Sequence, residues 1–291
     1  MVTVTTGGEL LLREQARPVV SSGFRQLDAL LPAGGVRPGS LVEWLAEGNA
    51  GTGGGGAASL AFAVACRLAA ASGGEASEQA RPRTIVVVDR TGWFHPPAVM
   101  PWLGDERRLV VARPSRDDDE IWTIDQALRC TGVAAVLAWP RARVGCSTAT
   151  RGSRFVGSAL GGAVQQWSTA MRRWQLAAAA SGAVGLFVRP LAARSEPSWA
   201  EARIAVMPQP GGTLTERRLR LTLAGGNWSA ATAGGEREVE VMLDLTRGIA
   251  TAPRSGGGLL RPPMPAPVAG VIGMEAGKIG LGRSGVACRA S

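Results

Sequence analysis

Tyrosine is absent from the 291 residues, histidine occurs only as His95, and the single lysine, Lys278, lies near the end of the chain. A phosphate-binding loop of the GxxxxGK[ST] type needs a lysine to reach the β- and γ-phosphates. The four cysteines have no paired spacing and, with one histidine, form no zinc-binding pattern. No apolar run reaches the ~18 residues of a membrane span, and no signal peptide is evident. These absences predict a cytoplasmic protein without a metal, cofactor or membrane anchor.

Arginine supplies almost all of the positive charge. The chain holds 32 Lys+Arg against 23 Asp+Glu, a formal net charge of +9. Residues 126–235 alone contain thirteen arginines and three acids, a local net charge of +10. Such a block indicates a phosphate backbone or an acidic protein as partner. The alternative is that an arginine-rich coding bias replaced lysine on ordinary surfaces.

Three regions differ in composition. Residues 1–20 are expected to be a poorly ordered lead-in, and residues 21–250 one core domain. Residues 251–291 are rich in glycine and proline without periodicity, which predicts a disordered tail. Within this tail, the PxxP spacing in residues 261–267 would suit partner binding as polyproline II, although an inert tail is the alternative.

Apolar strand-like and helix-like runs alternate in the first 200 residues. The expected strands are 41–45, 84–89, 109–112, 134–139 and 184–188, which are apolar on both faces as in buried parallel sheets. Helices are expected at 57–71, 117–130 and 163–180. Residues 218–223 and 236–241 alternate polar and apolar, as half-buried antiparallel strands do. The sequence therefore predicts an α/β protein: a mostly parallel twisted sheet with helices on both faces and antiparallel edge strands near the C-terminus.

Residues 21–43, SSGFRQLDALLPAGGVRPGSLVE, resemble the entry to the RecA-family ATPase core. A Ser-Gly pair there precedes a Leu-Asp helix, a Gly-Gly turn and the first core strand. The matching residues are Ser22, Gly23, Leu27, Asp28, Leu30, Gly34, Gly35, Gly39, Val42 and Glu43. The resemblance implies a RecA-like three-layer fold.

In that family the first strand leads into a phosphate-binding Walker A loop. In the segment that follows the first strand of this chain, glycine or threonine occupies the positions where the lysine and the Ser/Thr are expected. We therefore interpret this segment as a degenerate nucleotide-binding loop. Its residues are Gly48, Gly51, Thr52, Gly53, Gly54 and Gly55.

Three further catalytic positions of the family are also missing. Arg90 follows the second strand where a water-activating glutamate is expected, and Trp139 stands near the Mg²⁺-associated aspartate of Walker B. Arg189 occupies the strand end where a glutamine would sense the γ-phosphate. Together these changes predict a pseudo-ATPase.

Residues 125–138 and 171–190 resemble segments of one RecA-like subfamily, the inducible-mutagenesis protein ImuA. The resemblance implies a non-catalytic adaptor in the SOS response, acting in translesion synthesis near the nucleoid. The implied partners are an inactive Y-family-like polymerase homologue (ImuB-like) and an error-prone polymerase, with RecA and single-stranded DNA as further candidates. Two alternatives stay open: a RecA-like DNA-dependent ATPase with a divergent loop, and a damage-induced cell-division inhibitor of the same fold.

The arginine-rich connection 141–170 and the helix and strand that follow supply the candidate contacts with DNA or a protein partner. These are Arg141, Arg143, Arg151, Arg154, Arg172, Arg173 and Arg189. Flexible arginines suit phosphate contacts, but few aromatic residues accompany them to stack on bases, so both kinds of partner remain open. Trp44, Trp122 and Trp174 are expected in the core, and His95 in a structural turn.

Overall fold

The computed structural model describes residues 18–47, 55–71, 83–103, 108–140, 156–226 and 237–251, without the side chains of 156–166 and 250–251. The predictions for most of the lead-in and for the tail after residue 251 lie outside these residues. No helix in these ranges is long and apolar enough to cross a membrane.

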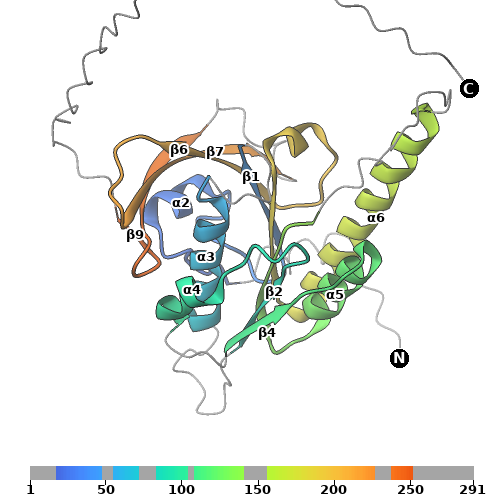
Figure 1. The fold of residues 1–291 in the computed structure, drawn as a ribbon, viewed down its shortest axis with the longest axis horizontal. Helices are drawn as coiled ribbons and strands as arrows, with labels where there is room; N and C mark the ends of the chain where they lie inside the picture. The colour runs from blue at the N-terminus through green and yellow to red at the C-terminus, as the bar shows by residue number, and fades with distance from the viewer. Residues whose placement is uncertain are drawn as a thin grey trace, which may run out of the picture. The chain divides into compact units, whose positions relative to one another are not determined.

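One sheet organises the described residues (Figure 1). Its strand order is β3-β2-β4-β5-β1-β6-β7-β8-β9. The strands are β1 (Leu41–Ala46), β2 (Thr84–Val88), β3 (Leu109–Ala112), β4 (Val133–Ala138), β5 (Val184–Pro190), β6 (Ala202–Gln209), β7 (Glu216–Gly225), β8 (Glu238–Asp244) and β9 (Ile249–Thr251). Neighbours from β3 to β6 pair in parallel, and β7, β8 and β9 continue the sheet antiparallel. The mostly parallel sheet with antiparallel strands near the C-terminus is confirmed.

Helices cover both faces of the sheet. They are α2 (Arg25–Leu30), α3 (Ala57–Ala71), α4 (Pro96–Leu103), α5 (Asp117–Arg129), α6 (Val156–Ser181) and the 3₁₀ helix η2 (Leu191–Ser195). Figure 1 shows α2, α3 and α4 on one side of the central strands and α5 and α6 on the other. Phe62 belongs to the core on the first side and Trp174 to a separate core on the second. The protein is therefore a three-layer α/β protein.

The hydrophobic pattern explains these layers. Every residue of β1 and of β4 is buried, as in strands covered on both faces. Helix α5 begins with four acidic residues, which stabilise the positive end of the helix dipole. Its residues Ile124 and Leu128 then face the core.

The C-terminal end of the sheet curves around α2, α3 and α4. Helix α2 packs against β7 and β8. Trp102 of α4 donates a hydrogen bond from its indole Nε1 to the carbonyl oxygen of Leu245, at 3.1 Å. Strands that lie far apart in the order of the sheet thus enclose the same helices.

Two sequence predictions need correction. Helix α6 begins at Val156, so the second half of the expected connection 141–170 is helical. Trp122, expected in the core, is 62% exposed because it lies on the outer face of α5, whereas Trp44 and Trp174 are buried as expected.

Candidate functional site

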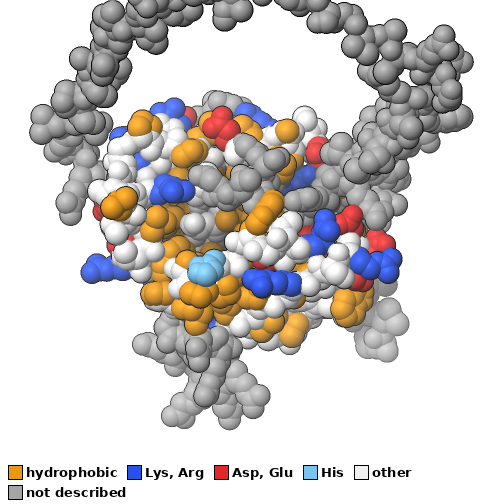
Figure 2. Space-filling model, in the orientation of Figure 1, with side chains coloured by type: hydrophobic (Ala, Val, Ile, Leu, Met, Phe, Trp, Pro, Cys, Tyr) orange, Lys and Arg blue, Asp and Glu red, His pale blue; other side chains and the backbone are white. Residues whose placement is uncertain are grey.

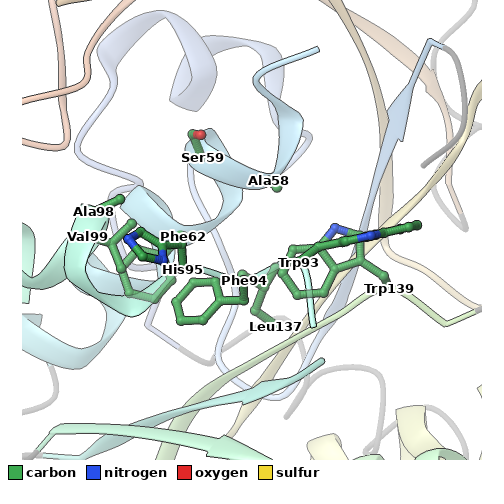
Figure 3. Close-up of a pocket in the computed structure, with 10 residues that line it drawn as sticks. All are labelled: Ala58, Ser59, Phe62, Trp93, Phe94, His95, Ala98, Val99, Leu137 and Trp139. Carbon is green, nitrogen blue, oxygen red and sulfur yellow. The ribbon is translucent and has the colours of Figure 1, made fainter. Parts of the chain in front are cut away.

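An apolar cavity of about 510 Å³ lies at the carboxyl ends of β2 and β4. The chain leaves β2 for α4 on one face and β4 for α6 on the other. Such a divergence opens the crevice in which α/β proteins bind ligands. The lining residues, drawn in Figure 3, are Ala58, Ser59, Phe62, Trp93, Phe94, His95, Ala98, Val99, Leu137 and Trp139.

Aromatic rings form the wall of this cavity. The ring centroids of Phe62 and Phe94 are 5.4 Å apart, and those of Phe94 and Trp139 6.4 Å. Phe94 and Trp139 are buried, while Trp93 at the rim is 43% exposed. Hydrophobic side chains gather on the surface around the pale-blue histidine in Figure 2. The cavity thus suits an apolar side chain better than a phosphate.

Asp89 fixes the loop that carries these aromatic residues. Its buried carboxylate accepts hydrogen bonds from the Thr91 hydroxyl at 3.2 Å, from the Trp93 amide at 3.1 Å and from the Phe94 amide at 2.8 Å. Arg113 also pairs with this carboxylate, at 3.8 Å, so Asp89 holds the loop and the residue that follows β3 together. His95 follows this loop, and its carbonyl oxygen accepts a hydrogen bond from the Ala98 amide at the start of α4.

Arg189, at the end of β5, is only 1% exposed. Its guanidinium donates to Glu43 Oε1 at 3.1 Å and to Glu196 Oε2 at 2.5 Å. The same group lies over the Trp167 ring, 4.1 Å from its centroid. The interpretation of Arg189 as a contact with DNA or a partner is therefore wrong, because its charge is neutralised inside the protein.

Arg203 of β6 completes this buried ion cluster, which we define as Glu43, Arg189, Glu196 and Arg203. Its Nε donates to Glu43 Oε2 at 2.6 Å. Its terminal nitrogens donate to three carbonyl oxygens in and next to η2, those of Ala193, Arg194 and Glu196. The cluster therefore joins β1, β5 and β6 to the turn that connects the last two.

Arg172 and Arg173 of α6 form intramolecular contacts and keep part of their surface exposed. Arg173 pairs with Asp125 of α5 at 3.4 Å, and Arg129 pairs with the same carboxylate at 2.8 Å. Arg172 hydrogen-bonds to Gln175 and lies over the Trp199 ring, 4.5 Å from its centroid. Neither arginine lies among the residues that line the apolar cavity.

Most of the residues predicted for the degenerate loop and the basic connection lie outside the described part of the chain. These are Gly48, Gly51, Thr52, Gly53, Gly54, Arg141, Arg143, Arg151 and Arg154. Gly55 is described and buried, and a Cβ added to it would lie 3.9 Å from Ala46 of β1. The described part of the loop thus lies against the first strand.

The aromatic cavity was missed in the sequence. Its signal was present in the segment GWFHPP, residues 92–97, but two of its walls come from α3 and β4, which are remote in the sequence.

These features define a three-layer α/β protein with an aromatic cavity at the carboxyl ends of β2 and β4 and a buried ion cluster that joins β1, β5 and β6. In the described residues no group of three or more histidine, cysteine or acidic side chains could hold a metal ion. No protein-family model and no curated protein matches the sequence.

Proposed function

We propose that this chain is a RecA-like, ImuA-like adaptor that acts in DNA-damage tolerance by binding protein partners and does not hydrolyse ATP. The observation that carries the proposal is the chemistry at the carboxyl ends of three central strands. Asp89 is bound to its own loop, Trp139 lines an apolar cavity and Arg189 is enclosed in the ion cluster. Phosphoryl transfer depends on charged and polar groups directed at the phosphates and Mg²⁺. These three positions supply none to such a substrate.

The proposed partner is the ImuB-like inactive polymerase homologue, which would join the adaptor to an error-prone polymerase. The aromatic cavity supports this part of the proposal. An apolar recess with an exposed tryptophan at its rim is typical of a protein interaction site. One buried aromatic or aliphatic residue of a partner often supplies most of the binding energy.

The first prediction concerns nucleotide chemistry. The purified protein should hydrolyse ATP more slowly than roughly 1 per minute, against about 10 per second for a typical enzyme. Phosphate release measured with and without single-stranded DNA tests this. Faster turnover that depends on DNA would favour the ATPase alternative and contradict the adaptor proposal.

The second prediction concerns the cavity. Trp93→Ala should weaken binding to the purified polymerase homologue by about 30-fold, the effect of losing a residue worth about 2 kcal/mol at an interface. Trp122→Ala is the matched control, because Trp122 is 62% exposed and lies on α5, away from the cavity lining. Calorimetry should show unchanged affinity for this control.

Equal affinities for the two variants would remove the cavity from the proposed interface. Binding to a cell-division protein, with no affinity for the polymerase homologue, would instead favour the division-inhibitor alternative.

A further inference from the structure

A second cavity, of about 260 Å³, lies between α3, α4 and the turn that joins β8 to β9. Three arginines line it: Arg67 from α3, Arg108 at the start of β3 and Arg247 from the turn. No aspartate or glutamate is among its lining residues in the described part of the chain. Three arginines from three separate elements therefore line one recess.

These arginines differ from most others in the described residues. Arg90, Arg129 and Arg218, for example, each pair with a carboxylate. In the same ranges, the side chains of Arg67, Arg108 and Arg247 form no hydrogen bond or ion pair, although the charge of Arg247 acts at longer range on Asp244 of its own turn. The Nε of Arg108 is also buried without a hydrogen-bond partner. Arg37, Arg90, Arg189 and Arg220 also have an Nε without a hydrogen-bond partner, but each of these is ion-paired to a carboxylate. Because buried donors are nearly always paired, the guanidinium of Arg108 indicates a missing acceptor.

The turn that carries Arg247 is held rigidly. Asp244 Oδ1 accepts hydrogen bonds from the Thr246 amide at 2.7 Å, the Thr246 hydroxyl at 2.6 Å and the Arg247 amide at 3.2 Å. Gly248 has a φ of +63° and lies so close to Trp102 that an added Cβ would be 2.4 Å from its ring. These contacts stabilise the backbone conformation of the turn that presents Arg247.

Cys66 is the remaining ionisable group among the lining residues, and it does not neutralise the charge of the three arginines. Burial raises the pKa of its thiol to about 12, although the neighbouring Arg67 lowers it. The thiol is therefore neutral at pH 7 and does not act as an internal counter-ion.

We propose that this cavity binds a compact, multiply charged anion of the phosphate class. Guanidinium groups form paired, charge-assisted hydrogen bonds with phosphate oxygens. A recess of this size and charge fits inorganic phosphate, pyrophosphate or a small phosphate monoester. A single-stranded nucleic acid instead requires an open basic groove with stacking platforms. The proposal is independent of the adaptor function, because the lining of this cavity does not overlap that of the aromatic one.

The test is calorimetric titration of the full chain with inorganic phosphate, pyrophosphate and glycerol phosphate at constant ionic strength. We expect one saturable site. Arg108→Gln and Arg247→Gln should each weaken binding about tenfold or more, the effect of losing a charge-assisted hydrogen bond. Arg116→Gln is the matched control, because Arg116 is exposed and does not line the cavity. Tighter binding of glycerol phosphate would identify a phosphate ester as the ligand, and tighter binding of the inorganic ions a free anion.

A second measurement separates binding from folding. At a ligand concentration of about 100 times Kd, the thermal midpoint of the wild-type protein should rise by roughly 5 °C or more. The variants should show the wild-type midpoint without ligand and a smaller rise with it. Absence of saturable binding by all three anions, or equal weakening in Arg116→Gln, would overturn the proposal. Binding of a DNA oligonucleotide alone would also overturn it.

Discussion

Glu43 lies in β1 with no exposed surface and accepts a hydrogen bond from each of two arginines, Arg189 and Arg203. Removing a carboxylate from water is costly unless its charge and lone pairs are satisfied. Both oxygens of Glu43 have an arginine partner here, and the second acid, Glu196, balances the remaining positive charge. The cluster is therefore electrically neutral, and each member depends on the others.

The third prediction follows from this dependence. Glu43→Gln should lower the free energy of unfolding by about 3–5 kcal/mol, because two buried guanidinium groups lose their common counter-ion. Glu240→Gln is the matched control, since Glu240 pairs with Arg218 and, at 3.9 Å, with Arg220, and all three side chains are partly exposed. Its cost should be below about 1 kcal/mol. Urea unfolding of the two variants measures both, and similar losses would show that the cluster has no special role.

The sequence identified Glu43 as part of a motif but did not reveal its partners. Arg189 and Arg203 follow it by 146 and 160 residues, and both fall within the basic block 126–235. Composition counts charges without showing which of them neutralise one another. For the same reason the sequence predicts Arg189 as a surface contact, although it is buried.

At the scale of elements, ion pairs of Asp125 link α5 to α6. Its carboxylate pairs with Arg129 within α5 and with Arg173 of α6. A second contact between the two helices is the hydrogen bond that Trp174 of α6 donates to the carbonyl oxygen of Ile121 in α5. Burial tends to raise the pKa of Asp125, but the hydrogen bonds and charges of Arg129 and Arg173 outweigh burial and hold its pKa below the ordinary value. The ionised carboxylate is thus the form that joins the helices.

The fourth prediction is the pH dependence of this contact. A carboxyl group with a lowered pKa stabilises the folded state above its unfolded pKa and loses this effect as pH falls through its folded pKa. Asp125→Asn should therefore cost about 1.5–3 kcal/mol at pH 7. The difference from the wild type should shrink toward zero below the ordinary pKa of 3.8. Chemical unfolding at a series of pH values measures it, and a difference independent of pH would exclude the ionised form as its source.

Elements with a strong hydrophobic pattern were predicted well. Helix α3 and strand β3 have the predicted bounds, since their apolar residues are flanked by clear breaks. Helix α4 was missed because it contains three prolines, two at its start, where proline is tolerated, and Pro101 inside it. Trp122 was misplaced because an apolar residue on a helix need not face the core.

At the scale of the whole molecule, the excess of arginine calls for a partner that carries negative charge. The fifth prediction is that the wild-type protein binds single-stranded DNA at low salt if Arg141, Arg143, Arg151 and Arg154 contact phosphates. Replacing all four by alanine should then flatten the log–log salt slope by about 2 to 3, because each phosphate contributes about 0.7 on single strands. The loss should be uniform across sequences, since backbone contacts carry no base information.

The binding of the same variant to the polymerase homologue should be measured beside its binding to DNA. A quadruple variant that loses this protein in a binding assay and keeps its affinity for DNA would assign the four arginines to an acidic protein surface. A wild-type protein that binds neither would leave the arginine excess as a compositional bias.

The hydrogen bond from Trp102 to Leu245 joins residues 143 positions apart, where the C-terminal strands reach α4. On the ribosome, this contact cannot form until β8 has been synthesised, because Leu245 follows that strand. Before β7 is made, β6 can pair with β1 on one side, and its other edge is open to pairing with another chain. Strand β7 thus covers this edge during biogenesis, and the residues made after β8 complete the packing of α4, one of the early helices.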